Sequence, residues 1–377
     1  MKFNYYLPVN IVFGRGRVDE VGTITSEYGK KALVVTGKNS AKKSGLYDRV
    51  KKSLDEAGVE NFLFDKATKN PLTTTAVEGA EIAKANGCDV VVAIGGGSIM
   101  DCAKGIAFCS VNEGDISDYI FGKKSSDEAL PLVLIPTTCG TGSEGNGFAV
   151  LTNPENGDKK SLRCAAIVAK ASIIDPECMK TMPKRGLASV GFDALCHCIE
   201  AYTANNAEPL TDALALHGIE LIAESLLPLY KGESESDALW DKITIAATIG
   251  GMVIGVAGVT LAHGMEHPAS GLKNIVHGEG LAAITPAVID AIWKGSPEKF
   301  AKISKILGGT GAEDCADTVR NLLNKLDLSL KLSDLGLGED DIPWMTENCQ
   351  KVSAGNLVNN PVPVDAELIA NVYRKSM

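Results

Sequence analysis

Histidine is scarce in this chain, and four of its five copies fall in two short clusters. Asp193 and His197 are four residues apart, as are His263 and His267, and His277 follows ten residues later. Residues four apart lie on one face of a helix, so each pair would present its side chains together. Imidazole and carboxylate groups are ligands of borderline divalent cations such as Fe(II) or Zn(II). The spacing therefore predicts a metal site.

The residues alone leave open which of the three later histidines bind the cation. The alternative is a set of buried, hydrogen-bonded histidines, but such histidines need partners and Asp193 supplies only one. The pattern is not HExxH, so it does not indicate a zinc protease. Cys196 and Cys198 would point to other faces of the helix and are interpreted as packing residues. His217, inside an apolar helix, is interpreted as a core or surface histidine.

A run of glycines, Gly95, Gly96 and Gly97, follows the short apolar segment 90–94. Ser98 is expected to be the N-cap of the helix that comes next, over 98–109. Free backbone amides and the helix dipole at such a position favour an anionic pyrophosphate. Glycine also allows close backbone approach and positive φ. The motif is not GxGxxG, so a plain strand–helix turn is the alternative.

A second polar loop, PTTCGTGSE at 136–144, follows another apolar run. Its hydroxyls, on Thr137, Thr138, Thr141 and Ser143, suit contacts to ribose and phosphate at the carboxyl end of a strand. Taken alone, this loop equally fits a solvated turn, because such loops are common.

The elements that must position these residues change character along the chain. The first half alternates strands with helices, which indicates a mainly parallel α/β sheet, whereas helices dominate after Pro183. We therefore predict an α/β dinucleotide-binding domain over 1–182 and an all-α domain over 183–377. The expected strands are 31–36, 61–64, 89–94 and 130–135, and the expected helices are 42–57, 73–86, 98–109, 211–230, 238–262, 280–292, 297–307 and 316–326.

Composition limits the possible partners. A length of 377 residues favours two domains, and a net charge of −10 disfavours nucleic acid and anionic membranes. The start of the chain lacks an apolar signal-peptide core, and ten cysteines without a CxxC pair indicate reduced thiols. Residues 243–262 carry no charge and are long enough to span a bilayer, but they are rich in Gly, Ala and Thr and have no flanking cluster of Lys and Arg. We expect a cytoplasmic protein with no membrane partner, and a homodimer by default.

With these motifs in place, the chain resembles the iron-containing (group III) alcohol dehydrogenases over nearly its whole length. The resemblance implies their fold, which is shared with dehydroquinate synthase, and a metal and nicotinamide in the cleft between the two domains. The motifs that carry it are FGRG at 13–16, NP at 70–71, GGGSIMDCAK at 95–104, PTTCGTGSE at 136–144, IIDPE at 173–177, GFDALCHCIEAY at 191–202 and HGMEHPASGLKNIVHGEGLA at 263–282.

The resemblance also assigns roles to single residues. It implies that Asp193, His197, His263 and His277 bind the metal, and that His267 is a catalytic residue near the nicotinamide that relays protons. Lys159 would touch the adenosine or ribose, with Lys160 as a close alternative. The cofactor-binding residues expected on this basis are Gly37, Ser40, Asn70, Gly95, Gly96, Gly97, Ser98, Asp101, Thr137, Thr138, Thr141, Ser143 and Lys159.

One departure from the family bears on the cofactor. Many members carry an aspartate after the second strand, where it binds the adenosine ribose, and this chain has Gly37. A carboxylate would repel a 2′-phosphate, so its absence, with Lys38, Asn39 and Ser40 alongside, predicts a preference for NADP(H). NAD(H), or dual use, is the competing interpretation.

The expected activity is reversible hydride transfer between NAD(P)(H) and a short-chain primary alcohol or aldehyde, assisted by Fe(II). Zn(II) accepts the same ligands, so iron follows from the resemblance alone. The alternatives are a glycerol- or diol-type polyol dehydrogenase, a dehydroquinate synthase-like lyase, and a nucleotide-binding sensor without turnover.

Overall fold

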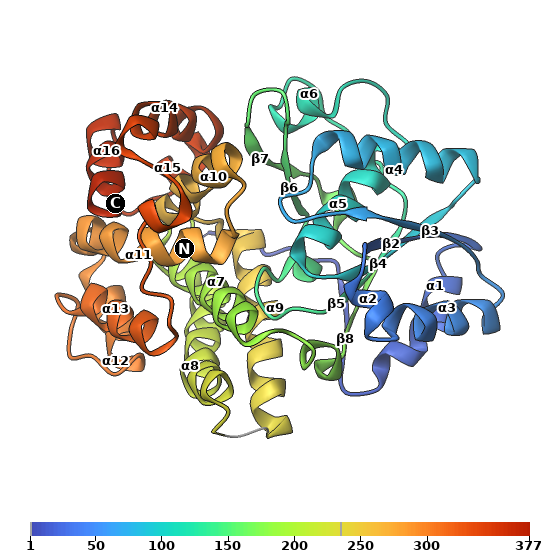
Figure 1. Ribbon diagram of the computed structural model, residues 1–377, viewed down its shortest axis with the longest axis horizontal. Coiled ribbons are helices and arrows are strands. Elements are labelled where there is room, and N and C mark those ends of the chain that lie inside the picture. The colour runs from blue at the N-terminus through green and yellow to red at the C-terminus, as the bar shows by residue number, and fades with distance from the viewer. Residues whose placement is uncertain (1, 234–235) are drawn as a thin grey trace. The chain divides into compact units, whose positions relative to one another are not determined.

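The computed structural model describes residues 2–233 and 236–377 (Figure 1). By its internal contacts the chain forms two compact units. The α/β unit comprises residues 7–156 and 160–182. The helical unit comprises residues 183–377, together with the N-terminal residues up to Tyr6 and the segment 157–159. The chain therefore visits the helical unit for three residues before it enters that unit for good at Pro183.

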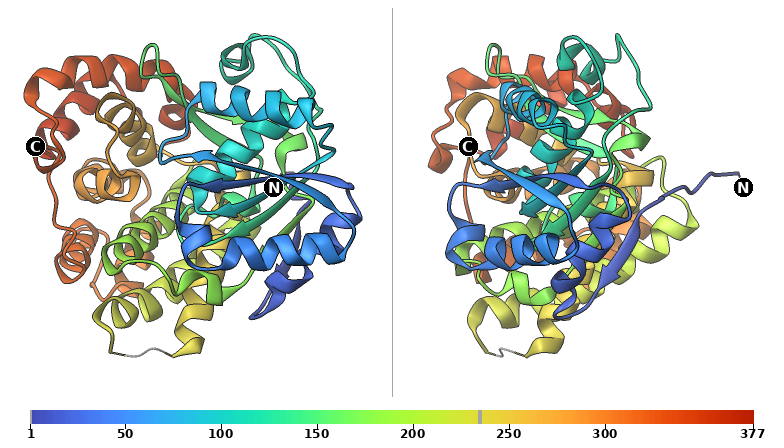
Figure 2. Two further views of the ribbon diagram at one scale, coloured as in Figure 1. Left: turned by 45° about the vertical axis from the view of Figure 1, so that its right-hand side comes forward. Right: turned by 90° about the vertical axis from the view of Figure 1, so that its right-hand side faces the viewer.

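The α/β unit is built on a six-stranded parallel sheet in the order β1-β8-β5-β4-β2-β3. Alternate side chains of its central strands enter two separate hydrophobic clusters, as the two-residue period of a strand requires. Figure 2 shows α4 and α5 on one face and α1 and α3 on the other. The strands are β1 (Asn10–Phe13), β2 (Lys31–Gly37), β3 (Glu60–Ala67), β4 (Val90–Gly95), β5 (Leu132–Pro136) and β8 (Ala171–Ile174). The helices are α1 (Val21–Ser26), α2 (Ser40–Lys43), α3 (Leu46–Glu56), α4 (Thr73–Ala85), α5 (Gly97–Cys109) and α6 (Ile116–Ile120), and a separate pair of strands is β6 (Phe148–Thr152) and β7 (Lys159–Arg163).

The strand order reverses between β2 and β4. The chain passes from β2 to its neighbour β3 on one side, and then returns to form β4 on the other side of β2. In an open parallel sheet, such a switch point leaves a crevice at the carboxyl ends of the two strands, where ligands bind. Gly37 ends β2 and Gly95 ends β4, so the two glycines selected from the sequence stand at this point.

The helical unit has α7 as its buried centre, with α8 and α9 packed against it and against each other. By length and composition alone, α8 and α9 could cross a membrane, but their most apolar stretches are 44% and 56% buried inside the structure. About half of the residues in these stretches are therefore enclosed by packing within the protein. The helices are α7 (Lys184–Thr203), α8 (Pro209–Lys231), α9 (Asp237–Ala257), α10 (Leu261–Lys273), α11 (His277–Ile292), α12 (Pro297–Ile306), α13 (Cys315–Lys325), α14 (Ile342–Val352), α15 (Ala354–Val358) and α16 (Ala366–Lys375).

Several helix boundaries differ from the sequence-based expectation, among them the start of α11, which was expected at 280 and lies at His277, and three differences have a local cause. The helix expected over 238–262 is two helices, because Gly258 has φ of 77° and ends α9. The helix expected over 42–57 is likewise divided at Gly45, which has φ of 76°. A positive φ interrupts a right-handed helix and is accessible to glycine without strain. Finally, Ser98 is not an N-cap, since α5 begins at Gly97 and its cap is Gly96.

Candidate active site

Three helices of the helical unit bring the predicted metal ligands together. Asp193 and His197 lie one turn apart on α7, His263 lies in the first turn of α10, and His277 is the first residue of α11. The Nε2 atoms of the three histidines converge on one oxygen. They lie 3.6 Å (His197), 3.4 Å (His263) and 3.6 Å (His277) from Asp193 Oδ1.

These separations fit a bound cation. Ligand atoms at bonds of about 2.1 Å around a tetrahedral centre lie about 3.4 Å apart. Asp193 Oδ1 and His263 Nε2 are buried and have no hydrogen-bond partner among residues 2–233 and 236–377, which would be costly without a cation. Asp193, His263 and His277 offer ligand atoms that all lie within 4.8 Å of one another. His197 stands outside that set of three, with its ring stacked on that of His263 at 4.5 Å.

The electrostatics of the cluster also suit a cation. Burial opposes the charge of Asp193, but His197 and His277 hold the pKa of its carboxyl well below the usual range. Burial lowers the pKa of His197 to about 4, so this imidazole is neutral and has a free lone pair. Burial also opposes a proton on His263, yet Glu200 and Asp193 raise the pKa of His263 to about 10. The negative charge gathered here favours a positive one.

Glu200, a residue that the sequence analysis missed, fixes the orientation of His263. It lies one turn after His197 on α7, and its Oε1 is in close contact with His263 Nδ1. Its Oε2 accepts from the backbone amides of Thr260 (2.7 Å) and His263 (3.3 Å), and from Thr260 Oγ1 (3.1 Å). A carboxylate on Nδ1 keeps a proton there, so that the proton a metal would displace is the one on Nε2.

Glu266 is the carboxylate that lies beside His277, as an ion-pair contact. It is completely buried on α10, where its Oε2 contacts His277 Nδ1 and its Oε1 accepts from Ser270 Oγ. Lys159 Nζ donates to Glu266 Oε2 at 3.3 Å, and both side chains are almost inaccessible to solvent. Glu266 thus joins a histidine predicted to bind the metal to a residue that the resemblance assigned to the cofactor.

The two remaining histidines, His267 and His217, have different surroundings. His267 lies one turn after His263 on α10, and its ring centre is 6.3 Å from that of His263 and 6.0 Å from that of His277. Burial and the nearby Lys159 ammonium hold the pKa of His267 well below its usual value. His217 is exposed and lies 3.5 Å from Glu220, away from the cluster.

The glycine turn and the threonine loop meet in the α/β unit. A Cβ on Gly96 would lie 2.9 Å from Thr138 Oγ1, and a Cβ on Gly97 would lie 2.3 Å from Thr141 Oγ1. A Cβ on Gly95 would lie 2.5 Å from Ile99. None of these three glycines has a positive φ, so close approach explains them and positive φ does not. The structure therefore places the two predicted cofactor loops side by side at the start of α5.

Two predicted cofactor residues are engaged within the protein. Asp101 Oδ1 accepts from Ser143 Oγ at 2.6 Å, and Asp101 Oδ2 accepts from the Val150 amide at 2.9 Å. Ser143 is buried, and its Oγ also accepts from Lys104 at 2.8 Å. This geometry suits support of the loop; direct contact of either residue with the cofactor stays a prediction.

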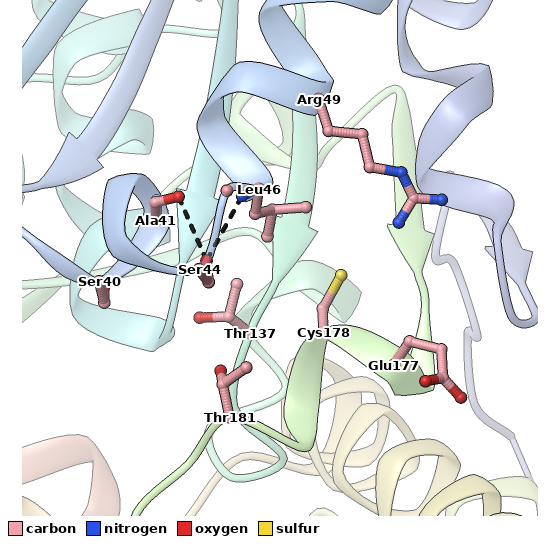
Figure 3. A pocket seen from close by; sticks show the side chains of 10 residues that line it. Ser40, Ala41, Ser44, Leu46, Arg49, Thr137, Glu177, Cys178 and Thr181 are labelled. Carbon is pink, nitrogen blue, oxygen red and sulfur yellow. Dashed lines mark hydrogen bonds between the residues drawn. The ribbon is translucent and has the colours of Figure 1, made fainter.

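A hollow of ≈ 160 Å³ lies beside Ser40 and Thr137, at the carboxyl ends of β2 and β5 (Figure 3). Ser44 and Thr181 are grouped with them on one side, and Arg49 lies on the other. The hollow is lined by Ser40, Ala41, Ser44, Gly45, Leu46, Arg49, Thr137, Glu177, Cys178 and Thr181. Two residues predicted to bind the cofactor, Ser40 and Thr137, thus border one concave surface.

Comparison with known proteins decides the family. The sequence profile "Iron-containing alcohol dehydrogenase" matches residues 8–176, and "Fe-containing alcohol dehydrogenase family, C-terminal" matches residues 187–377. The chain belongs to the iron-containing alcohol dehydrogenases. It is therefore an NAD(P)-dependent alcohol dehydrogenase, as the motifs predicted, and its α/β and helical units have the fold of that family.

Relatives of this alcohol dehydrogenase are similar over their full length. It is 34% identical to the 1,3-propanediol dehydrogenase of Klebsiella pneumoniae, over 99% of this chain and 98% of that one. It is 29% identical to the NADH-dependent butanol dehydrogenase A of Clostridium acetobutylicum, over 100% of both chains. Among solved structures, an archaeal halo-thermophilic alcohol dehydrogenase from a Red Sea brine pool has a TM-score of 0.95 and 36% identity, over 100% of this chain and 99% of the other.

Two other predicted cofactor residues of the enzyme have distinct settings. Asn70 lies between β3 and α4, with φ of 46°, a left-handed conformation that asparagine tolerates better than most residues. Gly37 has room for a side chain, because its Cβ would lie 3.4 Å from Ile99 Cδ1 and 3.6 Å from the carbonyl oxygen of Ala67. Packing therefore does not require glycine at position 37.

Proposed function

We propose that the enzyme oxidises short-chain primary alcohols and reduces the corresponding aldehydes, using NADP(H) and an Fe(II) ion. The convergence of three histidine nitrogens on Asp193 Oδ1 carries the metal assignment. The glycine turn and the threonine loop at the switch point of the sheet support binding of the dinucleotide. Iron is supported by the family to which the chain belongs, and Zn(II) would fit the same ligand set.

The residues of the chain divide the work. Asp193, His197, His263 and His277 would hold the metal, which supplies Lewis acidity toward an alcohol or carbonyl oxygen when bound. Glu200 and Glu266 would fix the tautomers of His263 and His277. We propose that His267, buried beside the ligands, relays the alcohol proton. The nicotinamide would accept or return the hydride.

The preference for NADP(H) rests on the end of β2. Gly37 provides no carboxylate to repel a 2′-phosphate, and Lys38, Asn39 and Ser40 follow it. Ser40 also borders the hollow shown in Figure 3 together with Arg49, although Asp19 already accepts two hydrogen bonds from that guanidinium. NAD(H) is the alternative, favoured by the butanol dehydrogenase relative, whose name states NADH dependence.

A diol substrate is the second candidate, because the similar enzyme of Klebsiella pneumoniae is a 1,3-propanediol dehydrogenase. Comparing butanal with 3-hydroxypropanal as substrates would separate the two possibilities. A dehydroquinate synthase-like lyase would instead turn over without net change in nicotinamide absorbance.

We also propose that the enzyme works in the cytoplasm as a homodimer. All ten cysteines are free thiols, which suits a reducing compartment. The dimer follows only from the prevalence of twofold symmetry among oligomers. Light scattering after gel filtration would give the mass in solution, and a monomer would contradict the proposal.

The function is tested with protein purified under anaerobic conditions, stripped of metal and then loaded with Fe(II) or Zn(II). Oxidation of NADPH or NADH is followed by absorbance with butanal as substrate. Metal-dependent turnover that is faster with NADPH would support the whole proposal. Faster NADH oxidation would overturn the cofactor preference, and no oxidation across short aldehydes with metal bound would overturn the activity.

A further inference from the structure

Lys104 is a fully buried lysine in the α/β unit, and no step of the proposed reaction uses it. It lies on α5, seven residues after Gly97. Its Nζ donates to the carbonyl oxygens of Ser143 (2.6 Å), Asn146 (2.9 Å) and Phe148 (2.8 Å). Ser143 Oγ, at 2.8 Å, and Asn146 Oδ1, at 3.3 Å, complete a cage of five oxygens.

The charge in this cage is compensated. Asp101 lies on the same helix, and Glu144 lies within the loop that supplies the five oxygens; their carboxylates favour the ammonium form. Ser143 has one hydroxyl proton, and it goes to Asp101 Oδ1. Its oxygen is therefore oriented to accept from Lys104. The buried ammonium thus has five acceptors and two neighbouring carboxylates, and these offset the free-energy cost of burying a charge.

All five acceptors belong to one short segment, residues 143–148, which begins within the threonine loop at Ser143 and continues beyond it. That loop carries Thr138 and Thr141, which pack against Gly96 and Gly97 at the start of α5. Carbonyl groups in such a short, largely buried connection need donors that a long helix or a sheet would otherwise provide. Lys104 supplies those donors from α5, the helix whose first turn forms the other cofactor loop.

We propose that Lys104 is a positioning residue that holds the threonine loop against the first turn of α5, and thereby sets the affinity for the nicotinamide dinucleotide. This inference rests on the proposed function, since it assumes that these loops bind the cofactor. Lys104 itself touches no cofactor, because the protein encloses it completely. Its effect should therefore appear in nucleotide binding more than in the chemical step.

The test replaces the ammonium by an uncharged chain of similar length, Lys104→Met, in the metal-loaded enzyme. Binding of NADPH and NADH is measured by fluorescence, and kcat is measured at saturating cofactor. We expect the Kd of the preferred cofactor to rise at least ~10-fold, or about 1.4 kcal/mol. We expect kcat at saturation and the metal content to stay close to those of the wild type.

Ile106→Ala is the matched control. Ile106 is buried on the same helix and packs against Gly79, so its truncation loosens the core without touching the cage. Equal losses of nucleotide affinity in Lys104→Met and Ile106→Ala would overturn the inference, because general destabilisation would then explain both. An unchanged Kd in Lys104→Met would also overturn it. A wild type that binds neither nucleotide would instead overturn the proposed function.

Should Lys104→Met fail to fold, Asn146→Ala replaces it. Asn146 Oδ1 is one acceptor of the cage and also accepts from the Phe148 amide, at 3.0 Å. This change keeps the buried charge and loosens the same segment. We expect a smaller rise in the nucleotide Kd, roughly 3-fold, again with kcat retained at saturation. A wild-type Kd in this variant would overturn the inference.

Discussion

Replacing Glu200 by glutamine should weaken metal binding through the tautomer of a neighbouring histidine. Oε2 of Glu200 accepts three hydrogen bonds, two from Thr260 and one from the His263 amide. In Glu200→Gln the amide oxygen must keep that place, so the NH₂ group replaces Oε1 and faces His263 Nδ1. Two donors cannot face each other, so the imidazole proton is driven from Nδ1 to Nε2.

The shifted proton would sit on the atom that points at the metal site. His263 Nε2 lies 3.4 Å from Asp193 Oδ1, among the converging ligand atoms, and a protonated nitrogen cannot bind a cation. Loss of a group that orients a ligand histidine costs 10- to 100-fold in metal affinity, or about 1.4 to 2.7 kcal/mol. We expect the metal affinity of Glu200→Gln to fall by an amount within this range. The substitution should not add a packing effect, because glutamine and glutamate have nearly the same volume.

The assay is a competition titration of the metal-free protein with Zn(II) against a chromophoric chelator, which gives the Kd directly. Ile303→Ala serves as the control, because Ile303 is buried on α12 and its truncation costs about 2 to 5 kcal/mol of stability without altering a ligand. The control should keep the wild-type Kd. A wild-type Kd in Glu200→Gln would refute the tautomer argument.

Three further predictions concern other parts of the enzyme. His263→Ala should lose both bound metal, measured by atomic absorption, and metal-dependent turnover; a normal rate would remove His263 from the ligand set. Gly37→Asp should raise the ratio of kcat/KM for NADH over that for NADPH by at least ~10-fold, because the new carboxylate would repel a 2′-phosphate. The added Cβ is tolerated, since it would lie 3.4 Å from Ile99. An unchanged ratio would mean that the phosphate is recognised elsewhere. Burial lowers the pKa of Lys104 to about 8 from 10.5, so the folded state releases this proton first. The contribution of Lys104 to the free energy of unfolding should therefore rise between about pH 8 and 10.5, by up to about 1.4 kcal/mol per pH unit. Denaturant titrations of the wild type and Lys104→Met at several pH values would measure it. A difference in stability between the two proteins that stays constant with pH would contradict this pKa.

The sequence predicted the two architectures and the convergence of the histidines, because both depend on local periodicity and on a rare residue type. Asp193 and His197 had to share a helix face, and the motifs around His263 and His277 placed these residues in the same family site. The start of α5 was wrong by one residue. Ser98 was expected to cap this helix, whereas Gly96 is the cap because the threonine loop leaves no room for side chains at 96 and 97.

The missed residues share a cause, which is that their role depends on contacts between distant segments. Glu200 is 63 residues from His263 in the chain, and Lys104 is 39 residues from Ser143. A weak indication was nonetheless present. Each is a charged residue in a mostly buried stretch of helix, where a charged side chain needs a partner. Such a residue can be recognised in a sequence, but its partner cannot be named.

Residues 157–159 belong to the helical unit although they lie within the sequence of the α/β unit, and this restricts how the enzyme can be divided. Lys159 compensates the buried charge of Glu266, and Asp158 accepts hydrogen bonds from Asn348 and Lys351, both at 2.7 Å. A gene fragment that starts at Pro183 would encode every predicted metal ligand and yet leave Glu266 without its lysine. The helical unit is therefore not encoded by one continuous stretch of sequence. Recombination that exchanges it between relatives must carry the turn at 157–159 as well, from the middle of the other half's coding sequence.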